Sequence, residues 1–306
     1  MVRIAFFGPQ GTFTEQAARV LAGAEELFPV ETIPAAFEAV RSGAADGACV
    51  PVENSVEGPV TATLDSAVDG DPLVAVAEAL LPIRFTVLVG ADRDPVADPP
   101  RTVASHPHAL AQVRGWLGEH LPGAEQLVAS STAAAAVGVL DGEYDAAVVA
   151  PVAAEHYPLK TFATDVADLA DARTRFLLLR TPGTLPEPTG ADRTSIVVAA
   201  ANRTGSLAGL LTELAMRGIN LTRLDARPVK GDYGTYRFFI DFEGHVTEPR
   251  IADALAAMRR RSMSVRFLGS HPRADGVTAT IEPGAGNDDF VAADAWVEAV
   301  RKGELA

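Results

Sequence analysis

Residues 3–15 read RIAFFGPQGTFTE, an apolar run followed by a glycine-rich turn and the polar start of a helix. The run Arg3–Phe7 predicts a buried strand, and the Gly-Pro pair behind it ends that strand. Thr12 places a hydroxyl where the first N–H groups of a helix over Thr14–Leu21 need an acceptor. A strand that leads through a turn into a helix predicts an α/β fold, with helices packed on a mostly parallel sheet.

The same alternation of short β-rich runs and alanine-rich helical runs continues to about residue 180. We expect further strands over Val30–Ile33, Gly47–Val50, Phe85–Val89, Thr102–Ala104, Gln126–Ala129, Ala146–Ala150 and Phe176–Arg180. We expect helices between them over Ala35–Arg41, Ala109–Leu117 and Thr132–Leu140.

One helix–strand unit occurs twice, at Thr32–Val50 and again 99 residues later at Ser131–Val149. Each copy has a hydroxyl residue before the helix and an apolar strand after it, and each strand leads into a proline turn, at Pro51 and Pro151. We interpret the repeat as two lobes whose strand ends face a common cleft. The alternative is that any two helix–strand units look alike in a chain rich in alanine and valine.

The charge balance is acidic, with 26 Lys and Arg against 40 Asp and Glu and a formal net charge of −14. Nucleic acids and anionic membranes are bound through basic patches, so we expect neither as a partner. The single cysteine, Cys49, excludes an intramolecular disulfide and fits a small buried apolar residue. No apolar run approaches the roughly 20 residues that span a bilayer, and the first residues are too short for a secretory signal, so we expect a cytoplasmic protein.

A proline- and glycine-rich stretch near residue 182 predicts a domain boundary. We expect a first domain over 1–181, a linker over 182–193, a second domain over 194–270 and a tail over 271–306. The second domain has the βαββαβ order of a ferredoxin-like fold, with elements expected at Thr194–Ala200, Gly205–Arg217, Leu221–Pro228, Tyr233–Phe242, Pro249–Met258 and Ser264–Leu268. In the tail, Asn287 is expected to cap a helix with an apolar stripe formed by Phe290, Ala293, Val297 and Val300.

Four segments place small polar side chains at predicted strand ends, where proteins with parallel sheets bind ligands: residues 8–15, 51–58, 105–112 and 174–176. The turn in 8–15 can aim backbone N–H groups at an anion, but it lacks the glycine spacing of a nucleotide-binding loop. Ser105 is placed to cap the helix that carries Gln112. His106 and His108 have no matching set of further ligands nearby in the sequence, so we expect no metal.

These motifs, GPQGTFT from Gly8, PVENS from Pro51, SHP from Ser105 and TRF from Thr174, resemble those of monofunctional prephenate dehydratases with a C-terminal regulatory ACT domain. The resemblance covers about residues 1–270 and includes their order. It implies a two-lobed catalytic domain similar to periplasmic binding proteins, with the active site between the lobes. It implies the decarboxylating dehydration of prephenate to phenylpyruvate in phenylalanine biosynthesis, without a cofactor. It implies catalytic roles for Thr174, Asn54, Ser105 and Gln112 and substrate binding by Arg175, Ser55, Thr12 and Phe176.

The chemistry of the side chains agrees with these roles. The Arg175 guanidinium is able to bind a substrate carboxylate through two hydrogen bonds. A threonine hydroxyl is too weak an acid to protonate a leaving hydroxide outright, so Thr174 is expected to act as a hydrogen-bond donor or proton relay. Glu53, beside Asn54, is not expected to be catalytic because an ionised carboxylate repels a dianion.

In the second domain the resemblance implies that phenylalanine binds as an allosteric effector in a homodimer or homotetramer. The residues expected to bind it are Gly205, Ser206, Leu207, Ala208, Asn220, Leu221 and Asp225. The chain departs from the family pattern at Ser206 and Ala208 and again at Asp225-Ala226, and Asp225 is equally well read as a plain charge at a strand end. Two alternatives stay open: the same reaction on arogenate, or a non-catalytic sensor of amino acids or dicarboxylates.

Overall fold

The computed structural model describes residues 2–23, 25–229 and 231–304. The chain divides into two compact units: one comprises Met1–Ser66 with Ala79–Thr181, and the other comprises Ala67–Glu78 with Pro182–Ala306. Residues 67–78, predicted from the sequence to belong to the first domain, thus cluster with the second unit. Two elements cross these limits in the sequence, α3 (Thr61–Val68) and β5 (Val74–Pro82).

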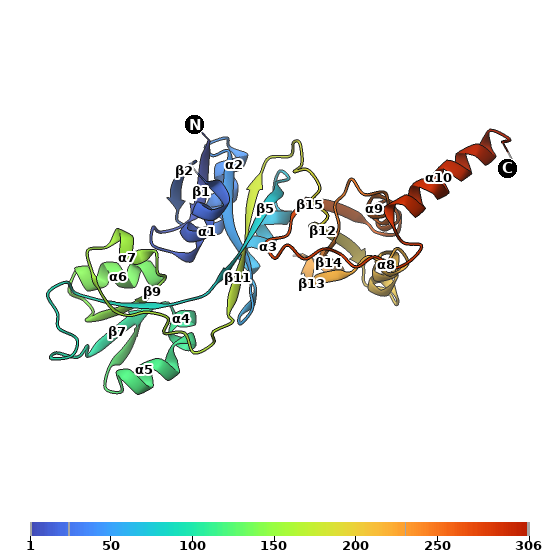
Figure 1. The fold of residues 1–306 in the computed structure, drawn as a ribbon. Coiled ribbons are helices and arrows are strands. Elements are labelled where there is room, and N and C mark those ends of the chain that lie inside the picture. Colours follow the sequence, from blue (N-terminus) through green and yellow to red (C-terminus); the bar gives the residue numbers. More distant parts are fainter. Residues whose placement is uncertain (1, 24, 230, 305–306) are drawn as a thin grey trace. The chain divides into compact units, whose positions relative to one another are not determined.

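The first lobe of the first unit is built on the strand that opens the chain (Figure 1). Its strands lie in the order β5-β11-β3-β1-β2, with β1 (Arg3–Phe7), β2 (Glu26–Val30), β3 (Gly47–Asn54) and β11 (Arg173–Arg180). β1 is parallel to β2 and β3, whereas β11 and the short β4 (Gly58–Pro59) run antiparallel to β3. The helices α1 (Phe13–Ala22) and α2 (Ile33–Arg41) contribute buried Ala17, Ala18 and Phe37 to the core.

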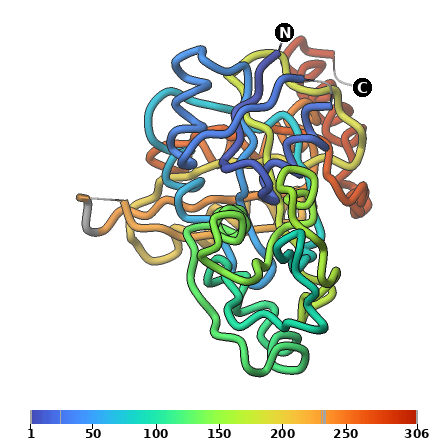
Figure 2. Tube along the Cα trace, turned by 90° about the vertical axis from the view of Figure 1, so that its left-hand side faces the viewer, coloured from blue at the N-terminus to red at the C-terminus, as the bar shows by residue number. Residues whose placement is uncertain are grey.

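The second lobe has its own five-stranded sheet, of order β10-β6-β9-β7-β8. Its strands are β6 (Thr86–Val89), β7 (Thr102–Ser105), β8 (Glu125–Val128), β9 (Ala146–Val149) and β10 (Lys160–Ala163). Its helices are α4 (Pro107–Gln112), α5 (Arg114–His120), α6 (Thr132–Leu140) and α7 (Ala153–His156). Separate apolar clusters cover the two faces of this sheet, as the alternation of Val87 and Leu88 between the clusters shows. In Figure 2 this lobe is the green body beside the blue first lobe.

The repeated helix–strand unit lies in both lobes, and its local chemistry is the same in each. Thr32 caps α2 by accepting the Ala35 N–H at 3.1 Å, and Ser131 caps α6 by accepting the Ala134 N–H at 2.9 Å. The strands that follow, β3 and β9, are buried over their apolar residues. The two-lobe interpretation is therefore confirmed. The expected turn at Pro51 is wrong, because Pro51 lies inside β3, which continues to Asn54.

Several element limits differ from the sequence prediction. The second strand is Glu26–Val30 instead of Val30–Ile33, because Thr32 already caps α2 and Ile33 is the first residue of that helix. The single helix expected over Ala109–Leu117 is broken at Val113, whose φ of −124° and ψ of 12° leave the helical region. The prediction also missed α3, β4, β5, α7 and β10, most of which are short.

The second unit contains the expected βαββαβ order. Its elements are β12 (Asp192–Ala201), α8 (Ser206–Ala215), β13 (Leu221–Val229), β14 (Asp232–Glu243), α9 (Pro249–Arg261) and β15 (Ser264–Pro272). The strands pair antiparallel in the order β13-β14-β12-β15, and the buried core between sheet and helices includes Ile196, Leu210 and Ile251. The predicted fold class is confirmed.

A helix, α10 (Asn287–Arg301), is present in the tail. Its N-cap is Gly286 and not Asn287, because the Asn287 amide instead donates to Glu248 Oε2 at 3.0 Å. No residue of α10 is buried, and Val297 and Val300 of the expected stripe are exposed.

Candidate active site

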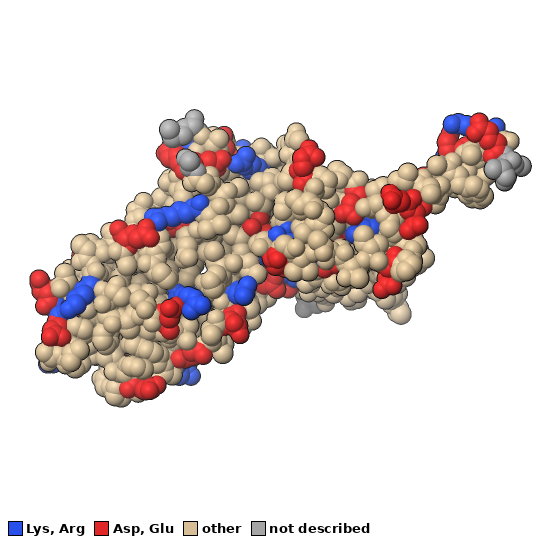
Figure 3. Space-filling view, in the orientation of Figure 1, with Lys and Arg blue, Asp and Glu red and all other residues tan. Residues whose placement is uncertain are grey.

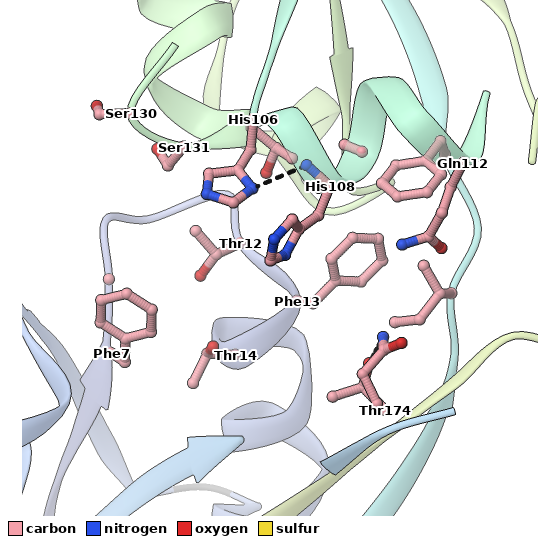
Figure 4. A pocket seen from close by; sticks show the side chains of 16 residues that line it. Phe7, Thr12, Phe13, Thr14, His106, His108, Gln112, Ser130, Ser131 and Thr174 are labelled. Atoms are coloured by element: carbon pink, nitrogen blue, oxygen red, sulfur yellow. Dashed lines mark hydrogen bonds between the residues drawn. The ribbon is translucent and has the colours of Figure 1, made fainter. Parts of the chain in front are cut away.

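A cavity of about 240 Å³ lies within the first unit, lined by residues of both lobes. This volume is below the roughly 300–1,000 Å³ of drug-sized ligand pockets, so it fits a small metabolite. The lining residues are Phe7, Gly8, Thr12, Phe13, Thr14, Asn54, Ile83, Phe85, His106, His108, Ala109, Gln112, Ser130, Ser131, Thr132 and Thr174 (Figure 4).

Asn54 and Thr174 form a hydrogen-bonded pair in the cavity wall. The two residues are opposite each other in the antiparallel ladder of β3 and β11, and Asn54 Nδ2 donates to Thr174 Oγ1 at 2.7 Å. Asn54 Oδ1 accepts the backbone N–H groups of Val56 and Glu57 at 2.8 and 3.0 Å, which fixes the orientation of the amide. Because Thr174 Oγ1 accepts from Asn54, its own proton remains available for an acceptor in the cavity.

Gln112, the last residue of α4, presents a second polar group to the cavity. Its side chain is only 7% exposed, and its Oε1 has no hydrogen-bond partner among the described residues. A buried amide oxygen without a partner is costly, so the geometry is suited to a ligand that supplies a donor.

Of the helices that begin at the cavity, α1 comes from the first lobe and α6 from the second. Thr12 caps α1 by accepting the Glu15 N–H at 3.4 Å, as the sequence predicts, and Ser131 caps α6. Helix N-termini carry partial positive charge and unpaired N–H groups, which favour bound anions. The lining residues include no Lys or Arg, so these backbone dipoles supply positive potential at the cavity wall itself.

His106 and His108 are the titratable residues of the lining. Their rings pack edge to face with centroids 4.9 Å apart, and His108 Nε2 lies 3.8 Å from Glu57 Oε2. Burial and the neighbouring His108 lower the pKa of His106, and Glu57 only partly opposes this shift. The ring of His106 is therefore neutral near neutral pH.

Four of the residues predicted for the site do not line the cavity. Ser105 is fully buried and donates to the Val148 carbonyl at 2.6 Å, which ties β7 to β9; the predicted cap of α4 is wrong because His106 occupies that position. Arg175 is 6% exposed and follows Thr174 in β11. Phe176 belongs to the core, and the exposed Ser55 accepts the Arg173 N–H through its hydroxyl.

The apolar wall of the cavity is not predictable from the sequence. Phe7, Phe13 and Phe85 line it, and Phe13 and Phe85 pack edge to face at 5.5 Å. Nothing in the sequence separates such residues from ordinary core phenylalanines. The position of His106 and His108, directly after a predicted strand, did indicate a place in the site.

Glu15 connects the glycine-rich turn of the first lobe to α7 of the second. Its Oε2 accepts the Gly11 N–H at 2.6 Å, and its Oε1 lies 2.6 Å from Arg19 NH2 and 2.8 Å from His156 Nε2. Arg19 also pairs with Glu155 of α7 at 2.6 Å. Burial raises the pKa of Glu15, but the hydrogen bonds from Gly11, His156 and Arg19 outweigh it and hold the pKa below its usual range.

Among the described residues, the remaining chemical features give no second site. Cys49 is fully buried, and burial raises the pKa of its thiol, as expected for a residue of the core. Within residues 2–23, 25–229 and 231–304, no group of three or more His, Cys, Asp or Glu side chains is placed to hold a metal ion. No helix in that part of the chain is long and apolar enough to cross a membrane. Acidic and basic side chains are interspersed over the face in Figure 3.

The predicted effector residues lie at three places in the second unit. Gly205, with a φ of +81°, precedes α8, and Ser206, Leu207 and Ala208 form its first turn. Asn220 and Leu221 lie at the start of β13. Asp225, further along β13, forms an ion pair with Arg223, which also pairs with Asp241 at 2.9 Å.

Comparison with known proteins identifies the family of this chain. The prephenate dehydratase family model matches residues 4–184, and the ACT domain model matches residues 194–260. A curated prephenate dehydratase of Amycolatopsis methanolica is 70% identical over the whole of both chains. The chain belongs to the prephenate dehydratase family.

Two further relatives agree with this placement. A curated prephenate dehydratase of Mycolicibacterium vanbaalenii is 46% identical over 99% of both chains. The crystal structure of a prephenate dehydratase from Arthrobacter aurescens, in complex with L-Phe, superposes with a TM-score of 0.92 at 44% identity and covers 98% of this chain and 100% of its own. The cavity lies entirely within the prephenate dehydratase match, and Gly205–Asp225 lie within the ACT match.

Proposed function

We propose that this chain converts prephenate to phenylpyruvate. In the reaction the ring loses its carboxylate as carbon dioxide, the freed electron pair enters the ring, and the hydroxyl on the opposite carbon departs with a proton as water. Aromatisation supplies the driving force. The enzyme must bind a dianion and assist a poor leaving group. The observation that carries the proposal is the Thr174 hydroxyl, aligned by Asn54 in a cavity where two helices begin.

Each polar group has a proposed task. Thr174 donates a hydrogen bond to the departing hydroxyl, since Asn54 occupies its acceptor side. Gln112 Oε1 accepts from the proton of the same hydroxyl, and the N-termini of α1 and α6 hold the carboxylates. Arg175, the buried residue that follows Thr174 in β11, adds positive potential where the dielectric is low. Ser105 acts indirectly, by holding β7 on β9 ahead of His106.

Phenylalanine is the proposed feedback effector, bound at the ACT domain of an oligomer. Gly205–Ala208 begin α8, whereas Asn220 and Leu221 follow its end, and a ten-residue helix is about 15 Å long. One chain therefore does not close both segments around a single amino acid. A second copy of the chain supplies the missing half, which supports a homodimer or a homotetramer.

A cytoplasmic location is also proposed, because the lone cysteine leaves no intramolecular disulfide to require an oxidising compartment.

Turnover of prephenate by the purified chain is the direct test. We expect formation of phenylpyruvate, followed by its ultraviolet absorbance, and slower formation when phenylalanine is added. A parallel reaction with arogenate distinguishes the two substrates, since arogenate would yield phenylalanine instead. Binding of prephenate without turnover of either compound would reject the enzyme and favour a sensor.

A further inference from the structure

The fold determines which ring nitrogen of His106 carries the proton. It stands at the N-cap of α4, and its ring Nδ1 accepts the backbone N–H of His108 at 3.3 Å. A backbone N–H only donates, so Nδ1 is the unprotonated nitrogen of the ring. In the neutral imidazole the single proton is therefore on Nε2, which is a donor.

The surroundings keep this ring neutral. Burial disfavours the charged form of His106 most strongly. Of the two titratable neighbours, His108 also disfavours the charged form, whereas Glu57 favours it. Burial and His108 prevail over Glu57, so the pKa lies below the ordinary value of 6.5. Around neutral pH, His106 thus carries one proton, at one defined atom.

The free ring nitrogen lies on the cavity side. In Figure 4 the ring of His106 lies between Ser131 and Thr12, with Nδ1 turned to the bond with His108 and Nε2 on the side of Ser131. No described residue pairs with this Nε2. Thr12 and Ser131 are the caps of α1 and α6, so the N–H donor stands where both helix N-termini favour an anion. Thr12 and Ser131 accept backbone hydrogen bonds as caps, whereas His106 has a proton to give.

We infer that His106 binds the substrate, by donating Nε2–H to a carboxylate oxygen of the dianion held between the N-termini of α1 and α6. The hydrogen bond by which His106 Nδ1 caps α4 fixes the tautomer that carries the proton on Nε2. This inference rests on the proposed dehydratase function and adds to it a neutral donor, in a cavity lined by no Lys or Arg.

Two substitutions separate the two nitrogens. His106→Asn keeps an acceptor near Nδ1, and Asn is among the preferred N-caps, but it removes the donor at Nε2. His106→Gln keeps a donor near the position of Nε2 and loses the cap. We expect His106→Asn to lower kcat/KM for prephenate about 10- to 100-fold, mainly through a higher KM, with little change in Tm. We expect His106→Gln to lower kcat/KM less than His106→Asn does, and to lower Tm more.

The pH profile gives an independent readout. Protonation of wild-type His106 keeps the donor at Nε2 and adds a positive charge that favours the dianion, so the KM for prephenate should fall on the acid side of pH 6.5, the ordinary histidine value. In His106→Gln, whose side chain does not titrate, this fall in KM should be absent. His120→Asn, at the exposed end of α5 and outside the cavity, serves as the matched control and should behave as wild type.

The outcomes are distinct. A wild-type protein without turnover would reject the proposed function as a whole. If the wild type is active, a smaller loss of kcat/KM for His106→Asn than for His106→Gln overturns the inference. His106 would then act only as the N-cap of α4.

Discussion

The Thr174 hydroxyl shows how one hydrogen bond sets the direction of another. Asn54 donates to its oxygen, and the Asn54 carbonyl is itself held by Val56 and Glu57, so the amide is not free to reverse. The threonine proton is then left for the cavity. Preorganisation of this kind is useful in catalysis, because no reorientation is required as charge develops on the leaving oxygen.

Replacing Thr174 by Ala should therefore lower kcat by about 10²–10⁴-fold, the usual contribution of a positioned proton donor. Thr174→Ser, which keeps the hydroxyl, should retain most of the activity. Steady-state kinetics with prephenate measures both, and circular dichroism checks the fold. Thr86→Ala is a matched control, since Thr86 is also a buried strand threonine but lies outside the cavity. Near-normal turnover by Thr174→Ala would remove this hydroxyl from the mechanism.

At the scale of elements, α1 joins the two lobes through Glu15. The carboxylate is buried, holds the Gly11 turn and meets His156 of α7, while Arg19 reaches Glu155 on the same helix. The pKa of Glu15 is lower in the folded chain than in the unfolded chain, so its ionised form stabilises the fold. This contribution is complete above the unfolded pKa and is lost as the pH falls through the folded pKa.

Glu15→Gln should accordingly destabilise the protein by about 1.5–3 kcal/mol at neutral pH, the range for hydrogen bonds to a charged group. The difference from wild type should shrink on acidification below the ordinary carboxyl pKa of 4.5, because wild-type Glu15 then loses its charge. Chemical denaturation at several pH values measures it. Glu155→Gln is the control: Glu155 pairs with the same arginine but is 65% exposed, and it should cost at most about 1 kcal/mol. Equal losses for both variants would contradict the argument.

At the scale of the whole molecule, catalysis and regulation lie in different units of the chain. The cavity belongs to the first unit, and the proposed effector segments belong to the second, at opposite ends of α8. A site completed by a second copy couples effector binding to assembly, so each must favour the other.

Inhibition by phenylalanine should consequently weaken when the enzyme is diluted. We expect the concentration of phenylalanine that halves the rate to rise at low protein concentration, and phenylalanine to shift the sedimenting mass toward the assembled form. Assays over a wide range of enzyme concentration, paired with sedimentation velocity, test both. Unchanged inhibition of a protein that sediments as a monomer would disprove the shared site.

Local hydrogen bonds were predictable from the sequence, and long-range ones were not. The caps Thr12, Thr32 and Ser131 each accept an N–H three residues ahead, so the residue type at a helix start suffices to predict them. The βαββαβ order and the burial of Cys49 follow equally from composition and periodicity. Family motifs placed Thr174, Asn54, Gln112 and Thr12 together, and all four line the cavity.

Only the tertiary structure decided which partner each polar side chain uses. Asn54 meets Thr174 across 120 residues and Glu15 meets His156 across 141, through strand register and lobe packing that no local pattern encodes. Ser105 illustrates the difference, because its hydroxyl turned to the Val148 carbonyl and left the cap of α4 to His106. A hydroxyl at a helix start has several acceptors within reach, and the fold selects among them by burying some and leaving others at the cavity.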